Sequence, residues 1–180
     1  MNDKTKSIFL VEDNLFYAEK VKMGLSNEGN LNVTIFATGE KMLEYFDKEN
    51  ETPDIIILDY LLNSTDRYAK NGAQILEILR TKYKERISNA PVIMLSASTD
   101  VKEAVDLLKK GAKDYILKDE VVHDNLTKSI NNIIELKRLR NEMGLYKDQV
   151  HSLKRRLMLT LGVVIVFALV ATAYFVWFNG

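Results

Sequence analysis

Two features of secreted or thiol-dependent proteins are missing from this sequence. It contains no cysteine, which excludes disulfide bonds, thiolate metal sites and cysteine nucleophiles and fits a reducing cytoplasm. The first apolar run, residues 8–11, is too short for a signal peptide and is followed by two acidic residues. We therefore expect the N-terminal part of the chain to lie in the cytoplasm.

Net charge is also missing, because 25 basic residues balance 25 acidic ones. The balance is uneven along the chain. Residues 137–156 hold seven basic and two acidic side chains, so residues 1–136 hold five more acidic than basic ones. An acidic body followed by a basic segment argues against a nucleic-acid-binding body. The sequence therefore predicts no nucleic-acid partner.

One stretch is long and apolar enough to cross a membrane. Residues 157–178 carry no charge over 22 positions, and a helix of that length spans the hydrocarbon core. The alternative is a buried core helix, but we expect no second domain that could bury it. The basic residues 154–156 precede the stretch, so the positive-inside rule places the N-terminal domain in the cytoplasm. The same basic residues would be attracted to anionic lipid headgroups. Tyr174 and Trp177 suit the far interface, so we expect a single-pass protein of the inner (cytoplasmic) membrane.

A short apolar run, residues 53–59, organises the rest of the chain. Pro53 precedes a continuous Ile and Leu run that ends in Asp59, a pattern typical of a parallel strand buried on both faces. Four further segments resemble this strand: residues 7–12, 31–36, 91–96 and 114–117. Five such strands alternating with helical patterns predict an α/β fold with a doubly wound, five-stranded parallel sheet.

Helical patterns follow each expected strand. We expect a first helix that ends near residues 27–29. Further helices are expected at residues 38–48, 72–83 and 100–111, and a last one from residues 119–124 onward. Asp100, with Glu103 three residues later, has the spacing of a capping box. The connection from Tyr60 to Asn71 is long and polar and lies beside the candidate site.

The last helix has no obvious end. Its apolar residues are spaced 4, 3, 4, 3, 4, which is a heptad seam: Leu139, Met143, Tyr146, Val150, Leu153 and Leu157. Residues 126–133 begin similarly, but the 3, 3 spacing through Leu136 breaks the register. The pattern suggests a stalk, residues 126–157, that pairs with a second copy. The alternative is a single amphipathic helix lying against the domain or the membrane.

Three carboxylates are expected at one edge of the sheet. Glu12 and Asp13 end the first strand and Asp59 ends the third, and these strands flank the switch point of a doubly wound sheet. Such close like charges are unfavourable without a cation, and oxygen ligands suit Mg²⁺. Each acid alone could be a helix cap or a solvated strand end. The triplet predicts a metal site, with Asp59 as the candidate reacting group.

Two donors are expected at the same edge. Ser96 ends the fourth strand and Lys118 follows the fifth, so each could bind an oxyanion beside the acids. Taken singly, Ser96 would satisfy a backbone group, Lys118 would be a surface lysine and Tyr115 a half-buried aromatic.

These positions together resemble the receiver domain of two-component response regulators, over about residues 7–124. The motifs are Glu12-Asp13, Asp59 in ILDY, Ser96-Ala97 in MLSAS, and Tyr115 with Lys118 in DYILK. The resemblance implies a flavodoxin-like sheet of order 2-1-3-4-5. It also implies that Asp59 accepts a phosphoryl group from a phosphohistidine of a sensor histidine kinase or phosphotransfer protein.

The resemblance implies a role for each of the other site residues. Mg²⁺ would be bound by oxygen atoms of four residues: Glu12, Asp13, Asp59 and, through its backbone carbonyl, Leu61. Ser96 would hydrogen-bond the phosphoryl oxygens and Lys118 would pair with them. Tyr115 would change rotamer when Ser96 is drawn inward.

The sequence also departs from the family pattern. The usual proline after the phosphoacceptor strand is missing, and the loop up to Gly72 is longer than usual. Leu61 and Ser98 occupy the positions that usually tune dephosphorylation. The dephosphorylation rate typical of the family is therefore not assumed for this chain.

We therefore expect a membrane-tethered, stand-alone receiver that assists its own phosphorylation but is not otherwise an enzyme. Its parts would be a receiver in residues 1–124, a helical stalk in 125–156 and a transmembrane helix in 157–178. One rival is a constitutive membrane adaptor that keeps the fold without phosphorylation. Another is a Mg²⁺-dependent phosphohydrolase, against which Leu61 argues because that class has a second aspartate there.

Overall fold

Five parallel strands form one sheet in the computed structural model, which describes residues 5–26, 30–49, 51–62 and 68–179. The strands are β1 (Lys6–Val11), β2 (Leu31–Phe36), β3 (Ile55–Asp59), β4 (Val92–Ser96) and β5 (Asp114–Leu117). Their order in the sheet is β2-β1-β3-β4-β5. The predicted fold class and strand order are therefore confirmed.

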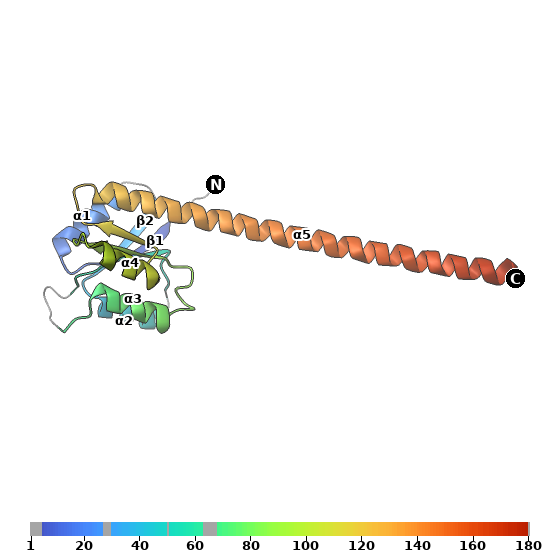
Figure 1. The fold of residues 1–180 in the computed structure, drawn as a ribbon, viewed down its shortest axis with the longest axis horizontal. Coiled ribbons are helices and arrows are strands. Elements are labelled where there is room, and N and C mark those ends of the chain that lie inside the picture. The colour runs from blue at the N-terminus through green and yellow to red at the C-terminus, as the bar shows by residue number, and fades with distance from the viewer. Residues whose placement is uncertain (1–4, 27–29, 50, 63–67, 180) are drawn as a thin grey trace. The chain divides into compact units, whose positions relative to one another are not determined.

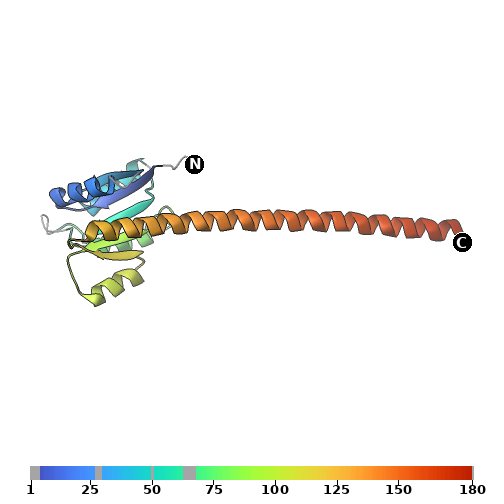
Figure 2. The same ribbon diagram turned by 90° about the horizontal axis from the view of Figure 1, so that it is seen from above.

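Helices cover both faces of this sheet. They are α1 (Leu15–Ser26), α2 (Gly39–Glu49), α3 (Gly72–Thr81), α4 (Val101–Lys109) and α5 (Val122–Asn179). Figures 1 and 2 show α2 and α3 on one face and α1 with the first turns of α5 on the other. The predicted end of the first helix, residues 27–29, lies outside the described residues.

The sheet is held by apolar side chains that alternate between its two faces. Every residue of β3 and β4 is buried, which explains why their sequences are continuous apolar runs. Phe9 of β1 contacts three other rings in the core under α2, with centroid distances of 5.0 Å to Phe36, 5.5 Å to Tyr45 and 5.6 Å to Phe46. Burying each such side chain contributes about 1.5–3 kcal/mol.

The start of α3 lies directly against the end of β3. Asn71 and Gln74 form a capping box, with N–H to side-chain oxygen distances of 3.0 Å in both directions. The N–H of Gly72 donates to the carbonyl oxygen of Tyr60 at 2.8 Å. A Cβ at Gly72 would collide with the carbonyl oxygen of Asp59, so glycine permits this close approach.

The chain divides into two compact units, Met1–Ile133 and Ile134–Gly180, and α5 contributes to both. In the first unit, α5 buries four apolar side chains: Val122, Leu126, Ile130 and Ile133. In the second unit, every side chain from residue 138 to residue 174 is exposed. The break in heptad spacing at Leu136 therefore coincides with the change from one unit to the other.

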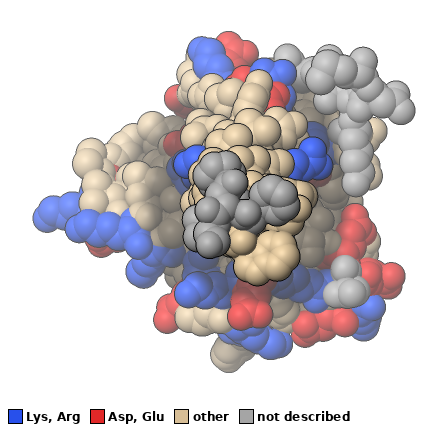
Figure 3. Space-filling model, turned by 90° about the vertical axis from the view of Figure 1, so that its right-hand side faces the viewer, with Lys and Arg blue, Asp and Glu red and all other residues tan. Residues whose placement is uncertain are grey.

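The C-terminal unit contains an apolar segment with no burial. Among the residues that the structure describes, one helix segment, Val122–Tyr174, includes a window apolar enough to cross a membrane, and none of that window is buried. Figure 3 faces the C-terminal end of α5 and shows mainly uncharged side chains, in tan, there. This segment is therefore long and apolar enough to cross a membrane.

Candidate functional site

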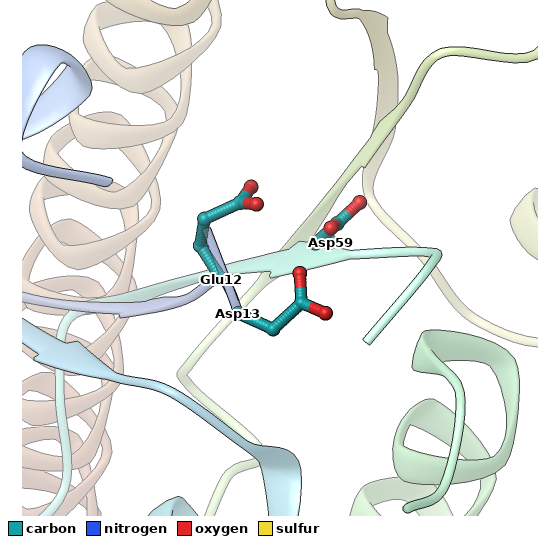
Figure 4. Close-up of side chains that lie close together, drawn as sticks. All are labelled: Glu12, Asp13 and Asp59. Carbon is teal, nitrogen blue, oxygen red and sulfur yellow. The ribbon is translucent and has the colours of Figure 1, made fainter. Parts of the chain in front are cut away.

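Three carboxylates meet at the carboxyl edge of the sheet. β1 and β3 are adjacent and parallel, with Val11 opposite Leu58, so the residues that follow β1 lie beside the end of β3. Glu12, Asp13 and Asp59 each offer an oxygen within 4.8 Å of the others. Figure 4 shows these three side chains lying close together. Glu12 and Asp59 are buried and Asp13 is partly buried.

Lys118 joins two of these carboxylates. Its ammonium nitrogen Nζ lies 2.7 Å from Glu12 Oε2 and 2.8 Å from Asp59 Oδ2. Its backbone N–H donates to the Ser96 carbonyl at 2.8 Å, which fixes the segment after β5 to β4. The ring of Tyr17 from α1 lies 4.8 Å from Nζ, a cation–π contact that the sequence did not predict.

Burial disfavours charge on these acids. It raises the pKa of Glu12 to about 7, with Asp59 adding to the rise and Lys118 opposing it. Burial likewise raises the pKa of Asp59, against the hydrogen bond and charge of Lys118. Burial, and then the charges of Glu12 and Asp59, raise the pKa of Tyr17 to about 12. The site therefore has too little positive charge to neutralise its carboxylates when all of them are ionised.

That deficit fits a divalent cation. Three ionised carboxylates and the single Lys118 ammonium together carry two negative charges. The donors are hard oxygen atoms, which suit Mg²⁺ better than softer metals. The structure brings together Glu12, Asp13 and Asp59, three of the four predicted ligands.

The fourth predicted ligand, Leu61, also lies beside Asp59. Its N–H donates to Asp59 Oδ1 at 3.2 Å, and its side chain is half exposed. The role of its carbonyl oxygen remains a prediction. Residues 63–67 of the long loop that follows lie outside the described residues.

A second polar group lies at the end of β4. The buried hydroxyl of Ser96 donates to Glu103 Oε1 at 3.0 Å. The Tyr115 hydroxyl lies 3.1 Å from the same oxygen and 2.7 Å from the carbonyl oxygen of Ser98. Both predicted switch residues thus share one carboxylate, Glu103 in the first turn of α4.

Glu103 is the site residue that sequence reasoning assigned wrongly. Its spacing from Asp100 predicted a capping box, but the Asp100 side chain accepts from the N–H of Lys102 at 2.8 Å. Glu103 instead contacts the two hydroxyls of Ser96 and Tyr115. The only signal in the sequence was an acid one turn into a helix that follows a strand ending in serine.

Comparison with known proteins identifies this arrangement. The family model described as the response regulator receiver domain matches residues 8–131. The DNA-binding response regulator MtrA of Mycobacterium bovis is 30% identical over 118 residues, which is 66% of this chain and 46% of that protein. The probable transcriptional regulator ycf27 of Cyanophora paradoxa is 31% identical over 118 residues, 44% of its length. The chain thus spans less than half the length of these relatives.

Solved structures agree on the fold. The receiver domain of Francisella response regulator 1452 has a TM-score of 0.61 at 24% identity and covers 73% of this chain and 98% of its own. A putative response regulator from Chloroflexus aurantiacus has a TM-score of 0.62 at 26% identity and covers 73% of this chain and 99% of its own.

Proposed function

Because the chain belongs to the response regulator receiver domain family, we propose that it is a phosphorylation-controlled switch with Asp59 as the phosphoacceptor. An oxygen of Asp59 forms a bond to phosphorus while the bond to a histidine nitrogen of the kinase or phosphotransfer protein breaks. The observation that carries this proposal is the Asp59 carboxylate, 2.8 Å from the Lys118 ammonium among converging acids. Receiver domains are phosphoacceptors in signalling rather than classical enzymes.

Other residues of the site position and neutralise the group being transferred. Mg²⁺, when bound by Glu12, Asp13, Asp59 and the Leu61 carbonyl, supplies positive charge that offsets the charge on the phosphoryl oxygens. Lys118 holds the Asp59 carboxylate in place and then pairs with a phosphoryl oxygen. Ser96 supplies a hydroxyl donor at the same edge.

We propose that Glu103 restrains the switch before phosphorylation. A phosphoryl group on Asp59 adds about one negative charge and new acceptor oxygens. Ser96 then leaves Glu103 for the phosphoryl group, so Glu103 loses one of the two hydroxyls that hold it. Since Glu103 belongs to α4, the change reaches a helix whose apolar residues Val101, Val105 and Leu108 are exposed. Such a surface suits a phosphorylation-dependent protein contact.

The membrane tether is the other part of the proposal. Residues 157–178 form the transmembrane helix, residues 125–156 the stalk, and the receiver in residues 1–124 lies on the cytoplasmic side. Support comes from the exposed apolar window of α5 and the basic cluster that precedes it. The stalk pairs with a second copy. The curated relatives are named as DNA-binding regulators, whereas we propose a protein contact as the output of this chain.

The test is the intact mass of the full chain in detergent micelles after incubation with Mg²⁺ and a small acyl-phosphate donor. We expect a gain of one phosphoryl group that disappears in Asp59→Asn and without Mg²⁺. No gain under any condition would leave the constitutive membrane adaptor as the better account. Turnover of an external phosphomonoester would instead support the phosphohydrolase.

The proposed restraint has its own readout. Hydrogen exchange of the backbone amides of α4 should speed up on phosphorylation in the wild type. In Ser96→Ala it should not respond to phosphorylation, because no hydroxyl leaves Glu103. An equal response in both proteins would contradict the role of Ser96 while leaving Asp59 as the phosphoacceptor.

A further inference from the structure

The seam of α5 is an uncovered apolar row in the C-terminal unit. The seam comprises the predicted residues from Leu139 to Leu157 together with Leu136, so the spacing from 136 to 157 is 3, 4, 3, 4, 3, 4. Its side chains are 43–70% exposed in the single chain. Ile133, which interrupts the register, is buried in the other unit. The seam is therefore three uninterrupted heptads long.

The charges beside the seam indicate how a second copy would pair with it. With Leu136 at heptad position a, the g positions hold Glu135, Glu142 and Gln149, and the e positions hold Arg140, Lys147 and Lys154. In a parallel pair, each g residue faces the e residue five positions later in the partner. Glu135 then meets Arg140, Glu142 meets Lys147, and Gln149 meets Lys154. Two pairs are of opposite charge and none is of like charge.

The antiparallel arrangement is disfavoured by the same residues. There the e positions of one helix face the e positions of the other. Those positions are all basic, so Arg140 would face Lys154 and Lys147 would face its own copy. Within one chain, Arg138 contacts both glutamates, at 2.9 Å to Glu135 and 4.0 Å to Glu142. These exposed pairs are weak and do not prevent pairing across an interface.

From this charge pattern we infer that residues 135–157 form a parallel two-stranded coiled coil with a second copy of this chain. Val150 at an a position, with Leu139 and Leu153 at d positions, favours two strands. A parallel pair also matches two chains that enter one membrane in the same direction. The inference deepens the self-association included in the proposed function, but it needs neither Asp59 nor its phosphorylation.

Because the chain has no cysteine, single cysteines give a clean test of the geometry. The full chain in lipid nanodiscs would carry either Leu139→Cys at a d position or the matched outer-face control Asn141→Cys. We expect oxidation to give a disulfide-linked dimer for Leu139→Cys and none for Asn141→Cys, with or without Asp59→Asn. A chain that stays monomeric, or equal cross-linking at both positions, would overturn the inference.

Charge exchange tests the orientation in a second way. Each of Glu142→Lys and Lys147→Glu places like charges across a parallel homodimer, whereas a mixture of the two variants restores opposite charges. With Leu139→Cys in both chains at equal amounts, the ratio of mixed to self-paired disulfides should exceed its random value of one by roughly tenfold. A random proportion would overturn the proposed pairing. The double variant Glu142→Lys with Lys147→Glu should pair with itself like the wild type, and its failure to do so would also count against the pairing.

Discussion

The two units of this chain differ in where their stabilising contacts come from. In the receiver unit, apolar side chains pack on both faces of the sheet and the buried charges of Glu12 and Asp59 meet Lys118. In the C-terminal unit, the described side chains from residue 138 onward are exposed, apolar ones included. The first unit is stabilised by contacts within itself. For the second unit we have proposed contacts with a second copy and with a lipid bilayer.

The largest effect is expected where charge enters the apolar segment of the second unit. Val166→Arg with Leu169→Arg places two charges near the centre of the proposed span, at about 2.5–3.5 kcal/mol each. The chain should move from carbonate-washed membranes into the soluble fraction. The matched pair Val166→Ala with Leu169→Ala should stay in the membranes. Arginine variants that remain there would contradict the proposed span.

The next largest effect is expected in the receiver unit. Lys118→Met leaves Glu12 and Asp59 buried without their cation, which costs about 3–5 kcal/mol when both are ionised. Urea unfolding at pH 8, followed by tyrosine circular dichroism, measures this loss, since six of the eight tyrosines precede residue 134. The exposed Lys147→Met serves as the control. Equal midpoints for the two variants would refute the role of Lys118.

A pH dependence is expected from the same acids. Burial raises the pKa of Glu12 from 4.5 to about 7 in the folded state, so folding favours its protonated form. Glu12 therefore adds a few kcal/mol to the free energy of unfolding below pH 4.5, and this contribution is lost as the pH rises to about 7. Mg²⁺ should restore stability more at pH 8 than at pH 5. Unfolding midpoints measured with Mg²⁺ or EDTA test this, and an equal gain from Mg²⁺ at both pH values would exclude it.

The smallest effect compares one glycine from each unit. Gly72→Ala pushes a methyl group against the Asp59 carbonyl oxygen, which should cost about 1–3 kcal/mol. In Gly144→Ala the new methyl group meets no atom within 4 Å, and alanine should favour the helix by about 1 kcal/mol. Urea unfolding of the receiver should therefore respond to Gly72→Ala alone. A higher unfolding midpoint in Gly144→Ala would mean that the two units do not unfold separately.

Much of the fold could be predicted because its signals are local. Continuous apolar runs predicted the buried strands. Thr38, a residue type that favours helix caps, accepts from the N–H of Lys41 at 3.2 Å at the start of α2. The sheet edge where Asp59 lies followed from the parallel arrangement, and the strand order from the family resemblance. These features depend on residues close together in the sequence or on rules that hold for every such sheet.

The contacts that could not be predicted depend on competition between local and distant partners. Glu103 had a suitable position for a helix cap, yet it contacts hydroxyls from β4 and β5. In the sequence, Tyr17 is simply an aromatic residue of an amphipathic helix. In the structure, its ring lies against the ammonium group of Lys118. The heptad break at Leu136 was visible in the sequence. Its cause, the burial of Ile133, required the structure.

The place of Lys118 in the chain has a consequence for synthesis. A ribosome makes Glu12 and Asp59 well before the lysine that neutralises them. Likewise, β4 lies between β3 and β5 in the sheet and has an unpaired edge until β5 has been made. A chain interrupted before residue 118 therefore keeps repelling acids and an open strand edge, which invite degradation or aggregation. The apolar stretch at residues 157–178 is made after the receiver. The receiver can therefore finish folding while that stretch is still inside the ribosome.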